Sequence, residues 1–431
     1  MTRSAKLLRP NLFQKAMLSW NETTPYNAVH SISIQKPLDG GELLQAIRKS
    51  LSNCGFDCEI GEIEYKEVES PVDSDETLRS IFETELNLPF ENLAETLPFR
   101  FFAIKTDEAH FRLGVCYFHP VASADCICWL LEDIVSTIAS GGAQPLEPWA
   151  SCNTHRYRRM FLSQWRFFLP WLSKLPGFLR EAKCYARING RRDCPPASRV
   201  YSLSLDNSQQ TWIRDQMKAT GATFNDVLIS LIIYGTAKTF PRRLHHRRRK
   251  DIAIGSIINI RNHFGIASKK TFGLFLAFFS VSHSINEQTA ITPLIRDVSR
   301  KTRAIKKDRL YALNLLVIGF GVFWQRFLSE QQRDRMSLRG FPLAGSVTNF
   351  FVDRYQRHLM QLPVENYWRA VSAGPATPLV ISATTFRNKM NLMLIANIFI
   401  YSDDDISSLS RCLESIMSSE EPKSTQVKAV A

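Results

Sequence analysis

The chain has 431 residues, which is long enough for two lobes that each bury a core of their own. Hydrophobic residues make up 45% of the chain and charged residues 22%, a composition that excludes an intrinsically disordered protein. The formal net charge of +13 favours polyanionic partners, such as nucleic acid, acidic lipid, coenzyme A or an acidic carrier protein. The sequence carries no motif of a nucleic-acid-binding module, so we expect no nucleic-acid partner.

The nine cysteines fit neither a paired CxxC zinc site nor a compact disulfide framework. We therefore expect no metal centre and a reducing, cytoplasmic compartment. The N-terminal MTRSAKLLRPNLFQ lacks the apolar core of a signal peptide. The most hydrophobic stretch, Leu310 to Phe327, is interrupted by polar residues and glycines, so the sequence predicts a buried helix there and not a membrane span.

In the first half of the chain, hydrophobic periodicity predicts three strands and one helix ahead of a central segment. Residues 1–25 are polar and irregular, and no element is expected there. Tyr26 to Gln35 alternates like a half-buried strand, and Glu42 to Leu51 has helical spacing of its leucines and isoleucine. Phe99 to Ile104 and His110 to Phe118 are predicted to be two strands around a polar turn.

The central segment, Leu113 to Ile134, predicts a buried strand, a tight loop with one histidine, and a helix. Pro120 ends the strand because proline cannot donate to a sheet ladder and restricts the residue before it. Helical periodicity begins at Asp125. His119 therefore stands where a strand ends and a helix is about to begin, and a histidine at a cleft can act as a general base at neutral pH. The alternative is a histidine that only satisfies a local hydrogen bond.

Basic residues alternate with phenylalanine and tryptophan from Arg156 to Arg180. Three interpretations remain open: a segment in peripheral contact with the inner face of a membrane, an RNA-stacking platform, or a crossover helix whose cations reach water along its flanks. Pro170 and Pro176 are expected to break the segment into short pieces, which favours the crossover.

A linker is predicted at 187–198, where Asn-Gly, Arg-Arg and Pro-Pro pairs occur. It would separate an N-terminal lobe (1–186) from a C-terminal lobe (199–417), with a flexible tail at 418–431. The basic run Pro241 to Lys250 is expected to be a solvated loop. Strands of the C-terminal lobe are predicted at Val200 to Leu205, Ile252 to Ile260 and Gly273 to Val281. Its helices are predicted at Ser208 to Lys218, after a cap at Thr223, and at Arg296 to Lys307. The lobe is expected to close with a hairpin, Leu379 to Thr385 and Met390 to Tyr401, and a helix, Asp403 to Met417.

The segment around His119 resembles the active-site stretch of the chloramphenicol acetyltransferase-like superfamily, which includes nonribosomal peptide condensation domains and wax ester synthases. Their motif is HHxxxDGxS, and His119 matches its second histidine, the catalytic base of the family. The chain departs from the motif elsewhere. The replacements are Phe118 for the first histidine, Ser123 for the aspartate, Ala124 for the glycine and Cys126 for the serine.

Further ordered features carry the same resemblance along the chain. They are "PLD" near residue 38, "TFNDV" after Ala222, a strand that ends at Arg261, and "VTN" ending at Asn349. The resemblance implies an α+β fold with two similar lobes, each a mixed sheet with flanking helices, and a tunnel at their interface. In the family the motif aspartate fixes the loop through an arginine. Here Ser123, Asp125 and Arg261 are the corresponding loop-structuring candidates.

The implied reaction is acyl transfer from acyl-coenzyme A or a phosphopantetheine-linked donor to an alcohol or amine, which can be a small molecule or a lipid. His119 would be the base, and Asn349 and Ser346 would position the substrate or its oxyanion. The resemblance implies no permanently bound cofactor and an acidic acyl-carrier protein as a partner. Two rivals stay open: a catalytically degenerate scaffold or docking protein, and a basic protein that binds a lipid surface or nucleic acid.

Overall fold

The computed structural model describes residues 10–70, 74–143, 145–150, 162, 168–186, 194–241, 249–266, 269–286, 288–325, 327–329, 332, 342–355, 358–374 and 377–418. Four predicted features lie wholly or largely outside these residues. They are the first part of the 156–180 segment, the linker up to residue 193, the basic run at 242–248 and the tail from residue 419.

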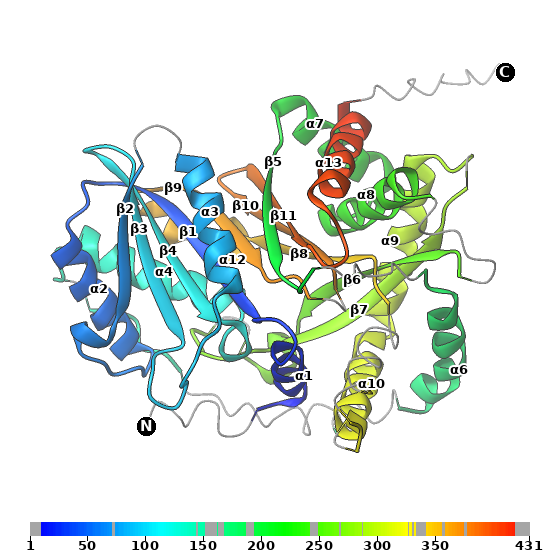
Figure 1. Cartoon of the computed structure of the whole chain (residues 1–431), viewed down its shortest axis with the longest axis horizontal. Helices are drawn as coiled ribbons and strands as arrows, with labels where there is room; N and C mark the ends of the chain where they lie inside the picture. The colour runs from blue at the N-terminus through cyan, green and yellow to red at the C-terminus, as the bar shows by residue number, and fades with distance from the viewer. Residues whose placement is uncertain are drawn as a thin grey trace.

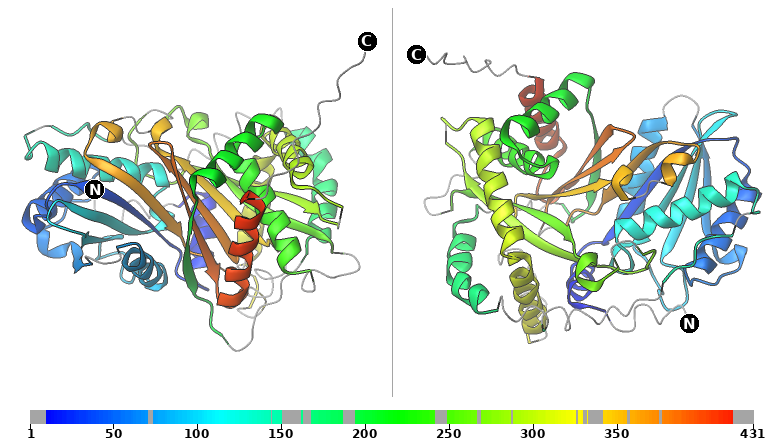
Figure 2. Two further views of the ribbon diagram at one scale, coloured as in Figure 1. Left: turned by 90° about the horizontal axis from the view of Figure 1, so that it is seen from above. Right: turned by 180° about the vertical axis from the view of Figure 1, so that it is seen from behind.

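The first sheet has five strands in the order β2-β3-β4-β1-β9. β2 and β3 are parallel, and the other neighbours are antiparallel. Its strands are β1 (Asn27–Gln35), β2 (Glu64–Glu69), β3 (Phe99–Lys105), β4 (His110–Phe118) and β9 (Val364–Val371). One face of the sheet packs on α2 (Gly40–Asn53) and α4 (Ala124–Ala139), and the other on α3 (Ser74–Asn87) (Figures 1 and 2). Alternation along the strands produces the two cores, since successive side chains point to opposite faces.

The second sheet has six strands in the order β5-β11-β10-β8-β6-β7, with β8 parallel to both β10 and β6. Its strands are β5 (Ser198–Ser204), β6 (Asp251–Asn259), β7 (Leu276–Ser284), β8 (Gly345–Phe351), β10 (Leu379–Phe386) and β11 (Lys389–Asn397). The helices packed with it include α7 (Asn207–Thr220), α8 (Phe224–Thr239), α9 (Ile291–Lys307) and α13 (Asp403–Ser418) (Figure 1). The predicted cap of α8 is confirmed, because Thr223 and Asp226 form a reciprocal capping box.

The two sheets are joined by a chain crossing and a shared core. β9 comes from the C-terminal part of the chain but forms the edge of the first sheet beside β1. Side chains of β1, α3 and β9 then pack with β5, β10 and β11 of the second sheet, as Val29 and Trp368 do with Val380. The observed α+β fold with two mixed sheets confirms the predicted fold class. The predicted lobe boundaries stay a prediction, and β9 departs from a strictly sequential division.

Two predictions about helix positions are wrong. Residues 1–25 contain α1 (Leu12–Asn21), which a capping box between Asn11 and Gln14 starts and Phe13 and Met17 anchor. The two prolines do not divide the 168–184 region, since α6 (Phe168–Cys184) continues through Pro176.

The described part of the 156–180 segment packs on the second lobe. Trp171 of α6 is buried, and its indole donates to the carbonyl of Asp308 at 3.1 Å. This packing compensates for the stability that the helix loses because Pro176 cannot donate a backbone hydrogen bond. The predicted membrane contact through 156–180 stays a prediction.

The apolar helix α10 (Leu310–Gln325) is buried only in its first half. Tyr311, Ala312 and Leu315 pack in the core of the second lobe. Aromatic side chains beyond them are exposed, with exposed fractions of 67% for Phe320, 52% for Phe323, 50% for Trp324 and 68% for Phe327. Apolarity alone did not distinguish the two halves. Within the described part of the chain, no helix combines the length and apolar character needed to traverse a bilayer.

Candidate active site

A cavity of about 420 Å³ lies between the two sheets. Its walls come from β4 and β9 of the first sheet, from β6, β7, β8 and β10 of the second, and from α1. All of the sequence-predicted site residues except Arg261 line it, namely His119, Ser123, Asp125, Ser346 and Asn349. The fold therefore brings together residues that are more than 200 positions apart in the sequence. The predicted tunnel stays a prediction.

His119 occupies a short 3-10 turn (His119–Val121) between β4 and α4. Its Nδ1 lies 3.1 Å from the carbonyl oxygen of Ala122. A carbonyl can only accept, so Nδ1 carries the proton in the neutral ring and Nε2 keeps a free lone pair. The turn is held from α1, where the side-chain amide of Gln14 donates to the carbonyl of Pro120 at 2.7 Å. This geometry suits a general base.

Two tyrosines hold the imidazole of His119. The ring of Tyr26 stacks on it with centroids 5.7 Å apart, and the ring of Tyr117 meets it edge-on at 5.6 Å. Burial, with the positive charge of Arg369 as a smaller second cause, lowers the pKa of His119 to about 4. Burial also raises the pKa of both tyrosines, so they stay neutral beside it. At neutral pH the ring is therefore an unprotonated imidazole.

The loop after His119 is tied to the second lobe through Arg261. The Nη2 of Arg261 donates to the hydroxyl of Ser123 at 3.3 Å, and its Nε lies 3.4 Å from a carboxylate oxygen of Asp125. Asn259 supports both partners, since its amide donates to Asp125 at 2.6 Å and its oxygen accepts from the Arg261 backbone N–H at 2.9 Å. An arginine-carboxylate pair is therefore present although the motif aspartate is missing, because the carboxylate comes two residues later.

Cys126 is a buried supporting residue and not a nucleophile that faces the cavity. Its sulfur accepts from Nη2 of Arg261 at 3.0 Å, and its thiol lies 3.2 Å from the carbonyl of Gly273. Arg261 is also enclosed by Trp129 and Phe275, with its guanidinium carbon 5.0 Å from each ring centroid. The charge of Arg261 is thus placed in a paired, desolvated position that fixes the start of α4.

The opposite wall is formed by β8. Its pairing with β6 covers only Gly345 to Val347, whereas its pairing with β10 continues past Asn349. At Asn349, β8 is therefore paired with β10 but no longer with β6. Its side-chain oxygen is buried without a hydrogen-bond partner. Because the two ends of an amide are assigned from their surroundings, one polar end of this amide is available to a ligand in either assignment.

Sequence reasoning missed the residues of β9 and β1 beneath His119. Arg369 lines the cavity, and His30 lies opposite it in the register of the two strands. Nδ1 of His30 is 2.7 Å from the hydroxyl of Tyr367. A usable signal existed in the sequence "YWRAV", since an arginine inside an apolar strand is rare unless its charge is paired.

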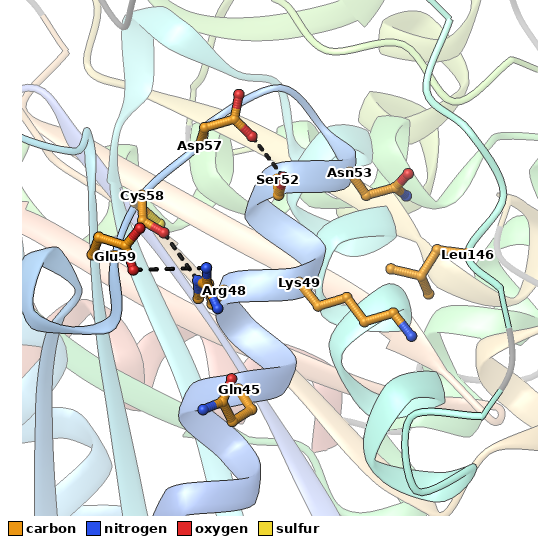
Figure 3. Close-up of a pocket in the computed structure, with 9 residues that line it drawn as sticks. All are labelled: Gln45, Arg48, Lys49, Ser52, Asn53, Asp57, Cys58, Glu59 and Leu146. Carbon is orange, nitrogen blue, oxygen red and sulfur yellow. Dashed lines mark hydrogen bonds and ion pairs between the residues drawn. The ribbon is translucent and has the colours of Figure 1, made fainter.

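A second hollow lies on the outer surface at α2 and is lined by polar side chains (Figure 3). In it Arg48 donates to the carbonyl of Cys58 at 3.2 Å and lies 3.7 Å from the carboxylate of Glu59. Ser52 donates to Asp57 at 2.6 Å. These groups satisfy one another at an exposed surface, and none is a buried base or nucleophile. The chemistry therefore favours the smaller cavity between the sheets.

No group of three or more histidine, cysteine, aspartate or glutamate side chains that could hold a metal ion occurs among the described residues. No model of a known protein family matches the sequence. No curated protein matches it significantly.

The fold is nevertheless similar to that of solved structures along nearly the whole chain. The first condensation domain of the calcium-dependent antibiotic synthetase, solved with a substrate analogue, has a TM-score of 0.66 and 13% identity, covering 94% of this chain and 95% of that one. The epimerization domain from the third module of tyrocidine synthetase B has a TM-score of 0.60 and 14% identity, covering 95% of each chain. The X-domain from teicoplanin biosynthesis has a TM-score of 0.57 and 14% identity, again covering 95% of each chain.

These likenesses extend over both sheets and confirm the architecture that the sequence resemblance implied. Sequence identities this low establish the fold but not the activity, which depends on the residues of the cavity. The chain therefore has the fold of these condensation and epimerization domains.

Proposed function

We propose that the protein is an acyltransferase that moves an acyl group from a thioester donor to an alcohol or amine acceptor, with His119 as general base. The observation that carries this proposal is the hydrogen bond from Nδ1 of His119 to the Ala122 carbonyl. It leaves Nε2 as the basic atom of a residue that lines the cavity. The lowered pKa of His119 keeps that atom unprotonated at neutral pH.

In the proposed step, the acceptor gives the proton of its O–H or N–H to Nε2 of His119. Its oxygen or nitrogen attacks the thioester carbon, and a tetrahedral intermediate with an oxyanion forms. The C–S bond then breaks, and the sulfur leaves as a thiol after it takes the proton from Nε2. His119 returns to its neutral state, so the reaction needs no nucleophile from the protein.

The oxyanion needs hydrogen-bond donors that are already in position when it forms. Asn349 supports this role, since its side chain lines the cavity and its amide nitrogen is a donor when the nitrogen is assigned to the unpartnered position. Ser346 lines the same wall and is a second candidate donor. Asp125, Ser123 and Arg261 would act indirectly, because they fix the loop that carries His119.

The donor is proposed to be acyl-coenzyme A or an acyl-phosphopantetheine on an acidic carrier protein. The net charge of +13 supports either one, since both present phosphate or carboxylate groups to the surface. The acceptor is treated as a small molecule or lipid whose reactive group reaches His119.

The test is intact-mass analysis of products after incubation of the purified full chain with acyl-thioesters and small alcohols or amines. The wild-type protein should form acylated acceptor and free thiol in equal amounts. His119→Ala should lower the rate by about 10²–10⁴-fold, the usual contribution of a general base, while its far-ultraviolet circular dichroism stays unchanged. A folded His119→Ala variant with the wild-type rate would remove His119 from the mechanism.

The rival functions predict different outcomes in the same experiment. A scaffold or docking protein would bind thioesters or carrier proteins without forming product from any pair. A surface-binding protein would retain RNA or anionic vesicles on a filter, with an affinity that falls steeply as the salt concentration rises.

A further inference from the structure

Arg369 is a buried cation in the wall of the cavity. It lies on β9, opposite His30 in the register of the first sheet, and its exposed fraction is 4%. It lines the same cavity as His119 and Asn349. A charge in such a position is costly to bury unless an opposite charge or a set of hydrogen bonds compensates for it.

Among the described residues, the hydrogen bonds of Arg369 use only one of its three nitrogens. Nη2 donates to the backbone carbonyl and the hydroxyl of Thr348, both at 3.1 Å, and to the carbonyl of Ala383 at 3.3 Å. These contacts reach from the first sheet to β8 and β10 of the second. Nε is buried without a partner, and Nη1 forms no hydrogen bond within the described part of the chain. Nη1 is therefore the donor that remains for a ligand.

Other buried cations of the protein are each paired with a carboxylate. Among the described residues, the buried lysines and arginines are Arg100, Arg261, Lys270 and Arg369. Arg100 lies 2.6 Å from Glu85, Lys270 lies 2.7 Å from Asp133, and Arg261 lies 3.4 Å from Asp125. Within the same residues, no carboxylate lies within 4.0 Å of Arg369. Arg369 is thus the exception to a rule that the rest of the structure follows.

The groups around Arg369 cannot supply the missing negative charge. Burial raises the pKa of Tyr117, Tyr367 and Cys128, so these groups are neutral. Burial lowers the pKa of His30, which is therefore neutral as well. The carboxylate of Asp125 interacts electrostatically with Arg369, but it already accepts a hydrogen bond from Asn259 and forms an ion pair with Arg261.

Among the described residues, the charged side chains that line the cavity are Asp125, Lys306 and Arg369. Since the carboxylate of Asp125 is paired with Arg261, which lies outside the lining, the cavity itself presents an excess of positive charge. A ligand with a negatively charged group would compensate for this positive charge. Arginine commonly binds carboxylates and phosphates, and a carboxylate is the smaller of the two anions, so it suits a buried guanidinium in a cavity of about 420 Å³.

We propose that Arg369 binds a carboxylate of the molecule that occupies the cavity, so that the substrate is an acid. This inference rests on the proposed function in one respect, since it takes the occupant to be an acyl acceptor or an acyl chain. The carboxylate would accept from Nη1 of Arg369 while the reactive group of the same molecule faces His119. Lys306, which also lines the cavity, would attract such an acid toward it.

The experiment measures binding without turnover. Isothermal titration is carried out on the full chain with matched pairs of acids and their carboxamides: hexanoate and hexanamide, 4-hydroxybenzoate and its amide, phenylalanine and its amide. At least one acid should bind the wild-type protein about ten- to hundredfold more tightly than its amide, as expected for a charge-assisted hydrogen bond. Arg369→Met should abolish that preference, and Arg369→Lys should keep part of it.

A second pair of ligands distinguishes the source of the carboxylate. Succinyl-coenzyme A and butyryl-coenzyme A are compared on His119→Ala, which is expected to bind a donor without transferring it. A preference for the succinyl donor places the acid on the acyl chain, and a preference confined to the free acids places it on the acceptor. If no acid is favoured over its amide, or if Arg369→Met retains the preference, the proposal is wrong.

The outcomes distinguish a failure of the carboxylate site from a failure of the proposed function. Carboxylate binding that depends on Arg369 in a protein without acyl transfer would retain the site and reject the reaction. Acyl transfer to neutral acceptors with no preference for acids would retain the reaction and reject the site. Arg100→Lys is the matched control, because it alters a buried arginine that is paired with Glu85 and does not line the cavity, and it should leave the preference for acids unchanged.

Discussion

Two buried arginines cross the contact between the sheets in opposite directions, and their surroundings differ. Arg261 follows β6 of the second sheet and reaches Ser123 and Asp125 at the start of α4. Arg369 lies on β9 of the first sheet and reaches Thr348 and Ala383 in the second. The first has a carboxylate partner, whereas the second has only neutral acceptors within the part of the chain that the structure describes.

From this difference we infer that Arg261 has a structural role and that the charge of Arg369 is available for binding a ligand. Arg261 and Asp125 compensate for each other's burial, so removal of either leaves an unpaired charge behind. Arg369 already bears the cost of an unpaired charge in the empty protein. Such a cost is typical of functional sites, where stability is lost in exchange for an interaction with a ligand. The variants below test whether this distinction is correct.

The largest effect on stability is expected for Arg261→Met. It removes the partner of Asp125 and leaves a buried carboxylate with only Asn259, so the free energy of unfolding should fall by about 3–5 kcal/mol. Urea denaturation followed by fluorescence measures the change. A loss below about 1 kcal/mol would mean that the pair does not stabilise the loop, which would contradict a structural role for Arg261.

Arg369→Met should change the free energy of unfolding of the empty protein by less than about 1 kcal/mol. The variant loses three hydrogen bonds to neutral acceptors but also removes an unpaired buried charge, and the two effects oppose each other. The same denaturation experiment measures it. A loss as large as that of Arg261→Met would show that Arg369 has a structural role like that of Arg261.

The pH dependence of acyl transfer should report the charge of Arg369. Because burial and Arg369 lower the pKa of His119 to about 4, the wild-type rate should stay high as pH falls through 6.5 and decline only near the lowered pKa. In Arg369→Met one of the two lowering causes is absent, so the decline should begin at a higher pH. The neighbouring Tyr26 and Tyr117 stay neutral in this range, so they do not shift it. An unchanged profile would place the two residues too far apart to interact.

The smallest effect is expected for Ser123→Ala. Arg261 keeps its carboxylate, its bond to the carbonyl of Thr271 at 2.9 Å and its contact with Cys126, so the variant loses one hydrogen bond to Arg261 at 3.3 Å and one to the Cys126 sulfur at 3.5 Å. The free energy of unfolding should fall by about 1 kcal/mol or less. A loss comparable to that of Arg261→Met would mean that Ser123, and not Asp125, replaces the motif aspartate.

Local patterns predicted the part of the site that is continuous in sequence. The apolar run of β4, the proline after His119 and the helical spacing from Asp125 are short-range signals, and the observed β4 and α4 confirm them. Thr223 and the closing hairpin were predicted for the same reason.

The missed part depends on contacts between distant segments. β9 pairs with β1 across more than 300 residues, and no periodicity within Val364–Val371 reveals which sheet it joins. The partner of a buried arginine is likewise a property of the folded chain. Sequence showed an arginine inside an apolar run, but only distances show that Arg261 has a carboxylate and Arg369 does not.

The most direct test of the central claim is the ratio of acyl-transfer rates for two histidine variants at opposite ends of β4. His110→Ala alters a surface residue that pairs with Asp107 and should retain the wild-type rate. His119→Ala should be about 10²–10⁴-fold slower with the same thioester and acceptor. Equal rates in the two folded variants would contradict the account, because the base at the cavity would then be dispensable.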